Sequence, residues 1–194
     1  MVQIKRILCP VDFSAVSRHA FDRALAVARS YDGEITVLHV LQVPSPMPAV
    51  PYAPVLPGGF RVEVRNRPQV LVELSRFLGL EHPYGVSVRQ EVIEADLVHK
   101  EILTRASGTS ADLIVMGTHG RSGVNHLFLG SIAEKVLRTS PIPALIVPPQ
   151  APDVPAGGIP FRSILCAVDF SQDSLQALSF AASLAEHSAG RLTT

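Results

Sequence analysis

The sequence lacks long apolar runs and an excess of charge of either sign. No apolar run approaches the ~20 residues that a membrane-spanning helix needs, and the first six residues contain no signal-peptide core. Lysine plus arginine and aspartate plus glutamate both number 17, so the formal net charge of +0 gives no electrostatic case for nucleic acid as a partner. We therefore expect a cytoplasmic protein that uses neither membrane nor nucleic acid.

The sequence also has few of the residues that usually mark a catalytic or metal site. The only two cysteines, Cys9 and Cys166, fall inside apolar, strand-like runs, which is typical of small buried hydrophobic residues rather than of a disulfide or a metal pair. His119 and His126 fit no HExxH pattern and have no cysteine or carboxylate cluster beside them. We predict no metal ligands and no catalytic residues.

Proline divides the chain. Six prolines between positions 44 and 57 exclude a helix or a central strand there, so we predict a long, partly extended loop over 44–59. A second stretch rich in proline and glycine, 149–161, predicts a linker. The chain is therefore expected to consist of a domain at 1–148, the linker at 149–161 and a short segment at 162–194.

Within 1–148 the hydrophobic pattern alternates between strand and helix. The predicted strands are 4–11, 34–43, 86–93, 112–116 and 144–147, and the predicted helices are 15–31, 60–80, 96–107 and 131–139. This alternation predicts an α/β fold with a doubly wound, five-stranded parallel sheet. In such sheets ligands bind at the carboxyl ends of the strands, where the strand order reverses.

The stretch 116–131 is the most informative part of the sequence. It places Gly117, Gly120, Gly130 and Ser131 where the buried strand 112–116 leads into a helix, with the spacing Gly-x2-Gly-x9-Gly-Ser. Neither the Walker pattern nor the Rossmann GxGxxG pattern is present. Main-chain N–H groups and a helix N-terminus at this position can hold an anion, and glycine allows close approach of the backbone. The alternative is a glycine-bearing surface loop without a ligand.

These residues resemble the nucleotide-binding signature of the universal stress protein family, and 140–147 resembles its last strand. The resemblance implies a Rossmann-like fold of the adenine nucleotide alpha hydrolase type with strand order 3-2-1-4-5. It also implies ATP, bound with Mg²⁺, and a homodimer formed through 144–147. With that order the ends of the first and fourth strands meet, so Asp12 and the glycine stretch share one crevice.

The resemblance implies a site built from residues of both strand ends and of the following helix. Asp12 would contact the adenine and ribose, although an Asx turn would equally explain it. Val40 would offer backbone contacts to adenine or serve only as a core residue, and Arg121 would meet a phosphate or only solvent. The implied binding residues are Pro10, Val11, Asp12, Val40, Met116, Gly117, His119, Gly120, Arg121, Gly130, Ser131, Ile132 and Ala133.

The segment 162–194 repeats the beginning of the chain. Roughly 13 of its 31 residues from Ile164 onward match those 157 positions earlier, which indicates a tandem duplication whose second copy holds only a first strand and helix. One strand and one helix bury too little apolar area to be stable alone. Either the chain is a fragment of a longer tandem protein, or the segment packs on the first domain or on another chain. Of these, we expect a truncated second copy that docks on another molecule or is poorly ordered.

Three functions are compatible with these observations. The leading hypothesis is an ATP-binding protein of stress response or signalling, in which the nucleotide biases a conformation or a dimer. The second is a nucleotide-free interaction module, and the third an enzyme that hydrolyses ATP or transfers a nucleotidyl group. The enzyme would need a base and metal-binding carboxylates near the phosphates, and the glycine stretch supplies neither.

Overall fold

The computed structural model describes residues 2–43, 66–79, 85–118, 129–151 and 161–194. The predicted loop at 44–59, the candidates His119, Gly120 and Arg121, and most of the predicted linker lie outside these residues.

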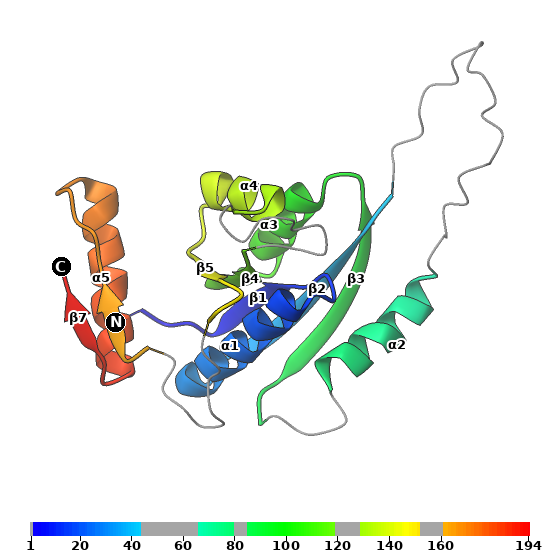
Figure 1. Ribbon diagram of the computed structural model, residues 1–194, viewed down its shortest axis with the longest axis horizontal. Coiled ribbons are helices and arrows are strands. Elements are labelled where there is room, and N and C mark those ends of the chain that lie inside the picture. Colours follow the sequence, from blue (N-terminus) through cyan, green and yellow to red (C-terminus); the bar gives the residue numbers. More distant parts are fainter. Residues whose placement is uncertain (1, 44–65, 80–84, 119–128, 152–160) are drawn as a thin grey trace, which may run out of the picture.

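Five parallel strands form the main sheet, in the order β3-β2-β1-β4-β5 (Figure 1). This confirms the doubly wound sheet and the predicted strand order. The order reverses between β1 and β4, where Leu8 lies opposite Ile114. The strands are β1 Arg6–Pro10, β2 Glu34–Gln42, β3 Val88–Ala95, β4 Leu113–Gly117 and β5 Ala144–Val147.

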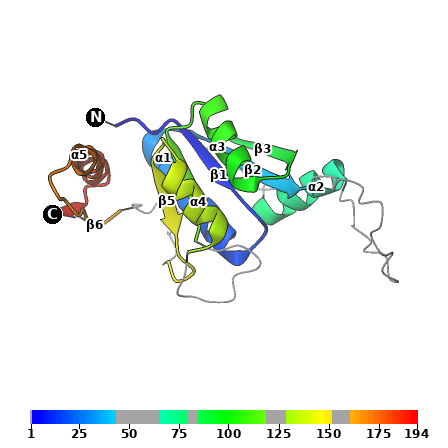
Figure 2. The same ribbon diagram turned by 90° about the horizontal axis from the view of Figure 1, so that it is seen from above.

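Helices cover both faces of this sheet. They are α1 Ala15–Tyr31, α2 Arg67–Leu78, α3 Val98–Gly108 and α4 Ser131–Thr139. Helices α1 and α2 pack on one face, and α3 and α4 on the other (Figures 1 and 2). Helix α2 begins at Arg67, with Pro68 in its first turn, where a missing N–H leaves no helical hydrogen bond unmade, and the first part of the predicted helix, 60–65, lies outside the described residues.

The core has two layers, one on each side of the sheet. On the α1 side, Phe21 is fully buried together with Ile7 and Val115, and on the other side Leu8 packs with Ile102. Cys9 is buried as predicted, and burial, with the nearby charge of Asp22, raises the pKa of its thiol far above the ordinary value. Cys9 is therefore a core residue and not a thiolate nucleophile.

Helix α1 begins and ends through local signals. The Ser14 Oγ caps it by accepting a hydrogen bond of 3.1 Å from the Ser17 N–H. It ends at Asp32, whose backbone is left-handed (φ 51°), and Gly33 follows. A Cβ at Gly33 would lie 2.8 Å from the carbonyl oxygen of Ile4, so only glycine lets the chain pass here.

Residues 161–194 form a small unit of β6 Ser163–Leu165, α5 Gln172–His187 and β7 Arg191–Thr193. Its local geometry matches that of β1, α1 and β2. Strands β6 and β7 pair in parallel, and Phe170 has the same left-handed backbone as its counterpart Phe13 (φ 64° and 65°). A Cβ at Gly190 would lie 2.5 Å from the carbonyl oxygen of Phe161, just as a Cβ at Gly33 would lie 2.8 Å from that of Ile4.

This unit contacts the rest of the same chain through α5. The Val2 N–H donates a hydrogen bond of 2.8 Å to the Ser183 Oγ, and the His187 ring stacks on Tyr31 with 3.8 Å between centroids. The expectation of poor order or of docking on another molecule is therefore not what the structure shows. The reason is that Phe180 and Leu184 of α5 pack against the core beside α1.

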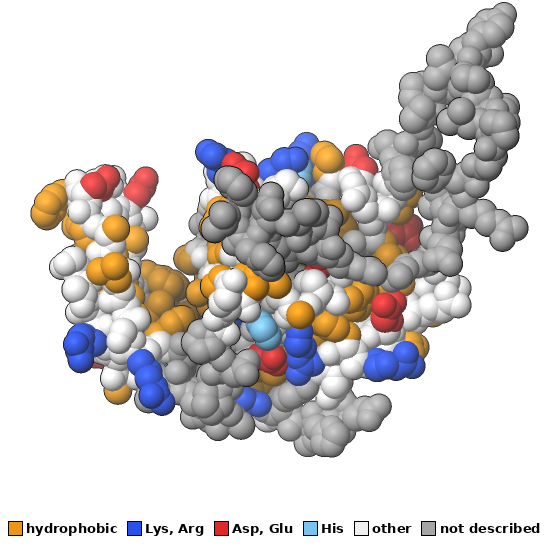
Figure 3. All heavy atoms as spheres, in the orientation of Figure 1, with side chains coloured by type: hydrophobic (Ala, Val, Ile, Leu, Met, Phe, Trp, Pro, Cys, Tyr) orange, Lys and Arg blue, Asp and Glu red, His pale blue; other side chains and the backbone are white. Residues whose placement is uncertain are grey.

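Part of the unit nevertheless remains uncovered. Leu165 and Phe170 are 81% and 85% exposed, whereas Leu8, the counterpart of Leu165, is fully buried beneath α3. Hydrophobic side chains are visible on the surface of this unit in Figure 3. Among the described helices, none has the length and apolar character needed to cross a membrane.

Candidate functional site

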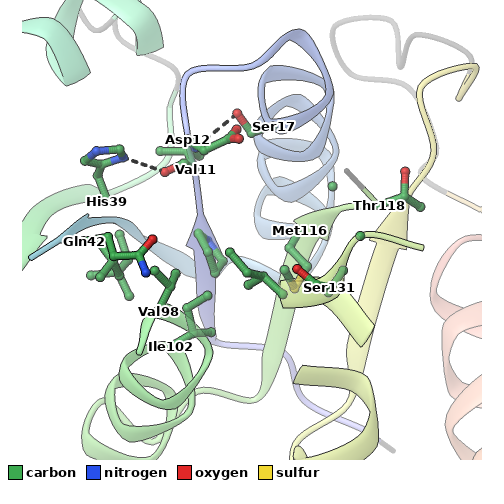
Figure 4. A pocket seen from close by; sticks show the side chains of 17 residues that line it. Val11, Asp12, Ser17, His39, Gln42, Val98, Ile102, Met116, Thr118 and Ser131 are labelled. Carbon is green, nitrogen blue, oxygen red and sulfur yellow. Dashed lines mark hydrogen bonds between the residues drawn. The ribbon is translucent and has the colours of Figure 1, made fainter. Parts of the chain in front are cut away.

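A cavity of about 600 Å³ lies at the carboxyl ends of β1, β2 and β4, at the point where the strand order reverses (Figure 4). This is where a doubly wound sheet is expected to bind a ligand. The cavity is lined by Pro10, Val11, Asp12, Ser17, Leu38, His39, Val40, Gln42, Val98, Ile102, Met116, Gly117, Thr118, Gly130, Ser131, Ile132 and Ala133.

The structure brings together every predicted site residue that it describes. Those around the cavity are Pro10, Val11, Asp12, Val40, Met116, Gly117, Gly130, Ser131, Ile132 and Ala133. His119, Gly120 and Arg121 belong to the segment between β4 and α4 that the structure does not describe.

The turn after β1 is held by hydrogen bonds among its own residues. The Asp12 carboxylate accepts from the Ser14 N–H at 3.1 Å and from the Ser14 hydroxyl at 2.6 Å. Asp12 therefore forms an Asx turn, as one interpretation of the sequence predicted, and it also lines the cavity, while the predicted contact with adenine and ribose stays a prediction. A carboxylate has about four acceptor positions on its two oxygens, so it can accept from several donors at once.

His39 supports the same turn from β2. Its Nδ1 lies 2.8 Å from the Val11 carbonyl oxygen, and its ring is 4.4 Å from that of Phe13. A carbonyl only accepts hydrogen bonds, so Nδ1 carries the proton and donates it. His39 is buried with its ring engaged by Val11, and it also reaches the cavity wall.

The side of β2 that faces β1 presents main-chain groups to the cavity. The Val11 N–H donates to the Leu38 carbonyl at 2.9 Å, which shows that the polar groups of Leu38 point toward β1. Main-chain polar groups alternate sides along a strand, so those of Val40 point the same way. Strand β1 ends at Pro10, which pairs with Leu38, and the N–H and C=O of Val40 therefore face the cavity beyond that end.

The N-terminus of α4 forms the opposite wall. Gly130 is its N-cap and supplies no side-chain hydrogen bond, so the N–H groups of the first turn, at Ser131 to Ala133, have no side-chain cap. Gly130 itself is fixed by donating a hydrogen bond of 2.8 Å to the Thr118 carbonyl. Helix N–H groups without a side-chain cap and the helix dipole together favour a negatively charged group at this wall.

The backbone conformation does not require glycine at position 117 or at position 130. Gly130 has φ −63° and ψ 147°, and Gly117 is absent from the described residues with positive φ. Any residue adopts such angles. What glycine provides at both positions is the absence of a side chain on the cavity wall, which lets a ligand approach the backbone.

The sequence prediction missed seven lining residues, since none belongs to a motif: Ser17, Leu38, His39, Gln42, Val98, Ile102 and Thr118. Figure 4 shows Gln42 beside Val98 and Ile102 at one end of the cavity, and Ser131 with Thr118 toward the other. Sequence signals exist for four of them. Leu38 and Gln42 share one side of β2 by alternation, and Val98 and Ile102 have the i, i+4 spacing of one helix face on α3.

The cavity thus has an apolar end and a polar end. Val98 and Ile102 offer apolar contacts at one, and the first turn of α4 offers N–H donors at the other, where Met116 lies beside Ser131 (Figure 4). Among the described lining residues the one charged side chain is Asp12. In the same part of the chain no group of three His, Cys, Asp or Glu residues lies close enough to hold a metal ion.

Comparison with known proteins places this architecture in a family. Residues 3–148 match the model of the universal stress protein family. Universal stress protein MJ0531 of Methanocaldococcus jannaschii is 31% identical over 144 residues, which cover 74% of this chain and 81% of that protein.

Solved structures share the fold. That of protein MJ0577 of M. jannaschii has a TM-score of 0.60 and 24% identity and covers 75% of this chain and 96% of its own. A universal stress protein of Archaeoglobus fulgidus in complex with dAMP has a TM-score of 0.51 and 19% identity, with 76% and 99% covered. On the match over 3–148 and the identity to MJ0531, the chain belongs to the universal stress protein family.

Proposed function

We propose that this chain binds ATP and acts in stress response or signalling through that binding. The observation that carries the proposal is the cavity of about 600 Å³, which joins an apolar end to the uncapped N-terminus of α4 at the reversal point of the sheet. An adenine nucleotide has the matching parts, a flat apolar base and an anionic tail. The dAMP complex of a protein with the same fold supports the choice of adenine.

In this proposal the base lies against Val98 and Ile102, and its polar edge meets the main chain of Val40. Asp12 accepts a hydrogen bond from a ribose hydroxyl. The phosphates reach Gly130 and the N–H groups that follow it, with Gly117 leaving room for their passage. His119, Gly120 and Arg121 stay candidates for the phosphate end on the strength of the sequence signature.

Magnesium would accompany the phosphates of ATP. Mg²⁺ usually takes one or two carboxylates together with phosphate oxygens and water. The described lining offers one carboxylate, Asp12, which is already engaged by Ser14. The described residues therefore fit a magnesium ion that arrives with ATP, not one bound before it.

We expect freshly purified protein to release adenine nucleotide on denaturation, detected by mass spectrometry. We also expect ATP with Mg²⁺, at about 100 times its Kd, to raise the free energy of unfolding by about 2.7 kcal/mol, because the ligand binds only the folded chain. Urea denaturation with and without ATP measures this. Absence of released nucleotide, together with no stabilisation at millimolar ATP, would contradict the proposal.

We further propose a homodimer formed through β5, which lies at an edge of the sheet. The Ile114 N–H donates to the Pro143 carbonyl and the Thr118 N–H to that of Val147, so the odd positions of β5 face β4. The main chain of Ile146 therefore points outward, where a partner strand can pair with it.

Ile146→Pro should convert the dimer to a monomer and leave the fold intact. Proline removes the outward N–H that would pair with a partner strand, and the hydrogen bonds between β5 and β4 stay in place. Sedimentation velocity at about 20 μM, a concentration suited to moderate self-association, compares it with the wild type. A wild-type monomer, or a proline variant that stays dimeric, would refute this pairing.

A nucleotide-free interaction module is the second candidate, favoured by the exposed Leu165 and Phe170 of the small unit. We infer that 162–194 is a partial second copy of the family domain, since it repeats the geometry of β1, α1 and β2. An enzyme is the least supported function, because Asp12 is the one titratable carboxylate on the described cavity wall and Ser14 holds it.

A further inference from the structure

Gln42 is a polar side chain at the otherwise apolar end of the cavity. It is the last residue of β2 and lies on the same side of that strand as Leu38 and Val40. Its neighbours there are Val98 and Ile102 of α3 (Figure 4). Gln42 is not part of the family signature in this sequence. Its side chain can therefore give this chain a ligand preference that the signature does not set.

One contact sets the orientation of the Gln42 amide. Its Nε2 donates a hydrogen bond of 3.4 Å to the carbonyl oxygen of Asp96, in the turn that precedes α3. A carbonyl oxygen accepts and never donates, so the NH₂ group must be the one that faces Asp96. The amide oxygen is therefore free to face the cavity, and Figure 4 shows it directed away from α3.

We propose that Gln42 reads the 6-position of a bound purine and favours an amine there over a carbonyl. The inference rests on the proposed nucleotide function and deepens it. With Nε2 held by Asp96, Oε1 accepts a hydrogen bond from the exocyclic amine of adenine. A 6-keto purine presents an oxygen to the same Oε1, and two acceptors repel each other unless the Asp96 contact breaks.

The test compares ATP with inosine triphosphate, which differs in having a carbonyl at position 6 and a proton on N1. Isothermal titration gives the Kd of both for the wild type, Gln42→Leu and Gln42→Met. We expect the wild type to prefer ATP and both variants to lose about 3- to 10-fold of that preference, the range of one hydrogen bond. ATP affinity should fall, whereas the affinity for inosine triphosphate should stay or rise.

Gln69→Leu is the matched control, because Gln69 is exposed on α2 and does not line the cavity. It should keep the wild-type ratio of the two Kd values. An unchanged ratio in the Gln42 variants, or equal losses for both nucleotides, would overturn this inference while ATP binding itself stands. Failure of the wild type to bind either nucleotide would overturn the proposed function and the inference together.

Discussion

The double variant Gly117→Val, Gly130→Val should fold normally and bind ATP about 100-fold more weakly than the wild type. Both glycines lie on the cavity wall, and each valine would add three carbons where the phosphates need to approach the main chain. Charge-assisted hydrogen bonds to a phosphate contribute about 1.5–3 kcal/mol each, so losing one or two of them accounts for this factor. Isothermal titration with ATP and Mg²⁺ measures the loss.

The fold should tolerate both changes. Gly117 lies in β4, where valine is a favourable residue, and Gly130 has backbone angles open to any residue. Gly108→Val is the control, since a Cβ at Gly108 meets no atom within 4 Å and Gly108 does not line the cavity. If the control loses as much affinity as the double variant, or the double variant binds ATP normally, the assignment of the phosphate end is wrong.

Phe21→Ala should lower the free energy of unfolding by about 3–5 kcal/mol, the usual cost of deleting a fully buried phenylalanine. Phe21 lies on α1 within the core layer that contains Ile7 and Val115, so the deletion removes apolar contacts and leaves a cavity. Urea denaturation followed by circular dichroism measures the change.

Phe170→Ala is the matched control for this prediction. Phe170 is 85% exposed, and substitutions at such positions usually change stability by no more than about 0.5 kcal/mol. A loss below about 1 kcal/mol for Phe21→Ala, or equal losses for the two variants, would show that the core is not built around α1 as described.

Elements with strong local signals could be predicted to the residue. Helix α1 is predicted at its observed bounds because Ser14 caps it and the Asp32-Gly33 pair ends it, and α4 and β5 also agree at both ends. Apart from the start of β2, which agrees, the ends of the other strands differ by one to two residues, because hydrogen bonding to neighbouring strands decides where a strand stops and the local pattern does not contain it. The strand order came from the family resemblance, since patterning alone does not encode it.

The residues of the site also divide into those that local sequence signals predict and those that only the folded structure reveals. Residues of the signature, such as Gly130 and Ser131, were predicted, because their spacing is visible in the chain. Val98 and Ile102 were not, since an apolar residue of a helix looks the same whether it faces a core or a cavity. Only the distance between α3 and the ends of the strands, a property of the folded sheet, separates the two cases.

The turn that follows β1 occurs twice in this chain, and the second occurrence shows how little surrounding structure the turn needs. Around Phe170, the Ser171 N–H bonds to Asp169 and the Ser174 N–H to the Ser171 Oγ, as their counterparts do around Phe13. Yet within the part of the chain that the structure describes, β6 pairs with β7 alone, and no strand takes the position beside it that β4 takes beside β1. Because a two-stranded unit already shapes this turn, the turn at Asp12 is preorganised, and a ligand that meets it there spends little free energy on ordering the backbone.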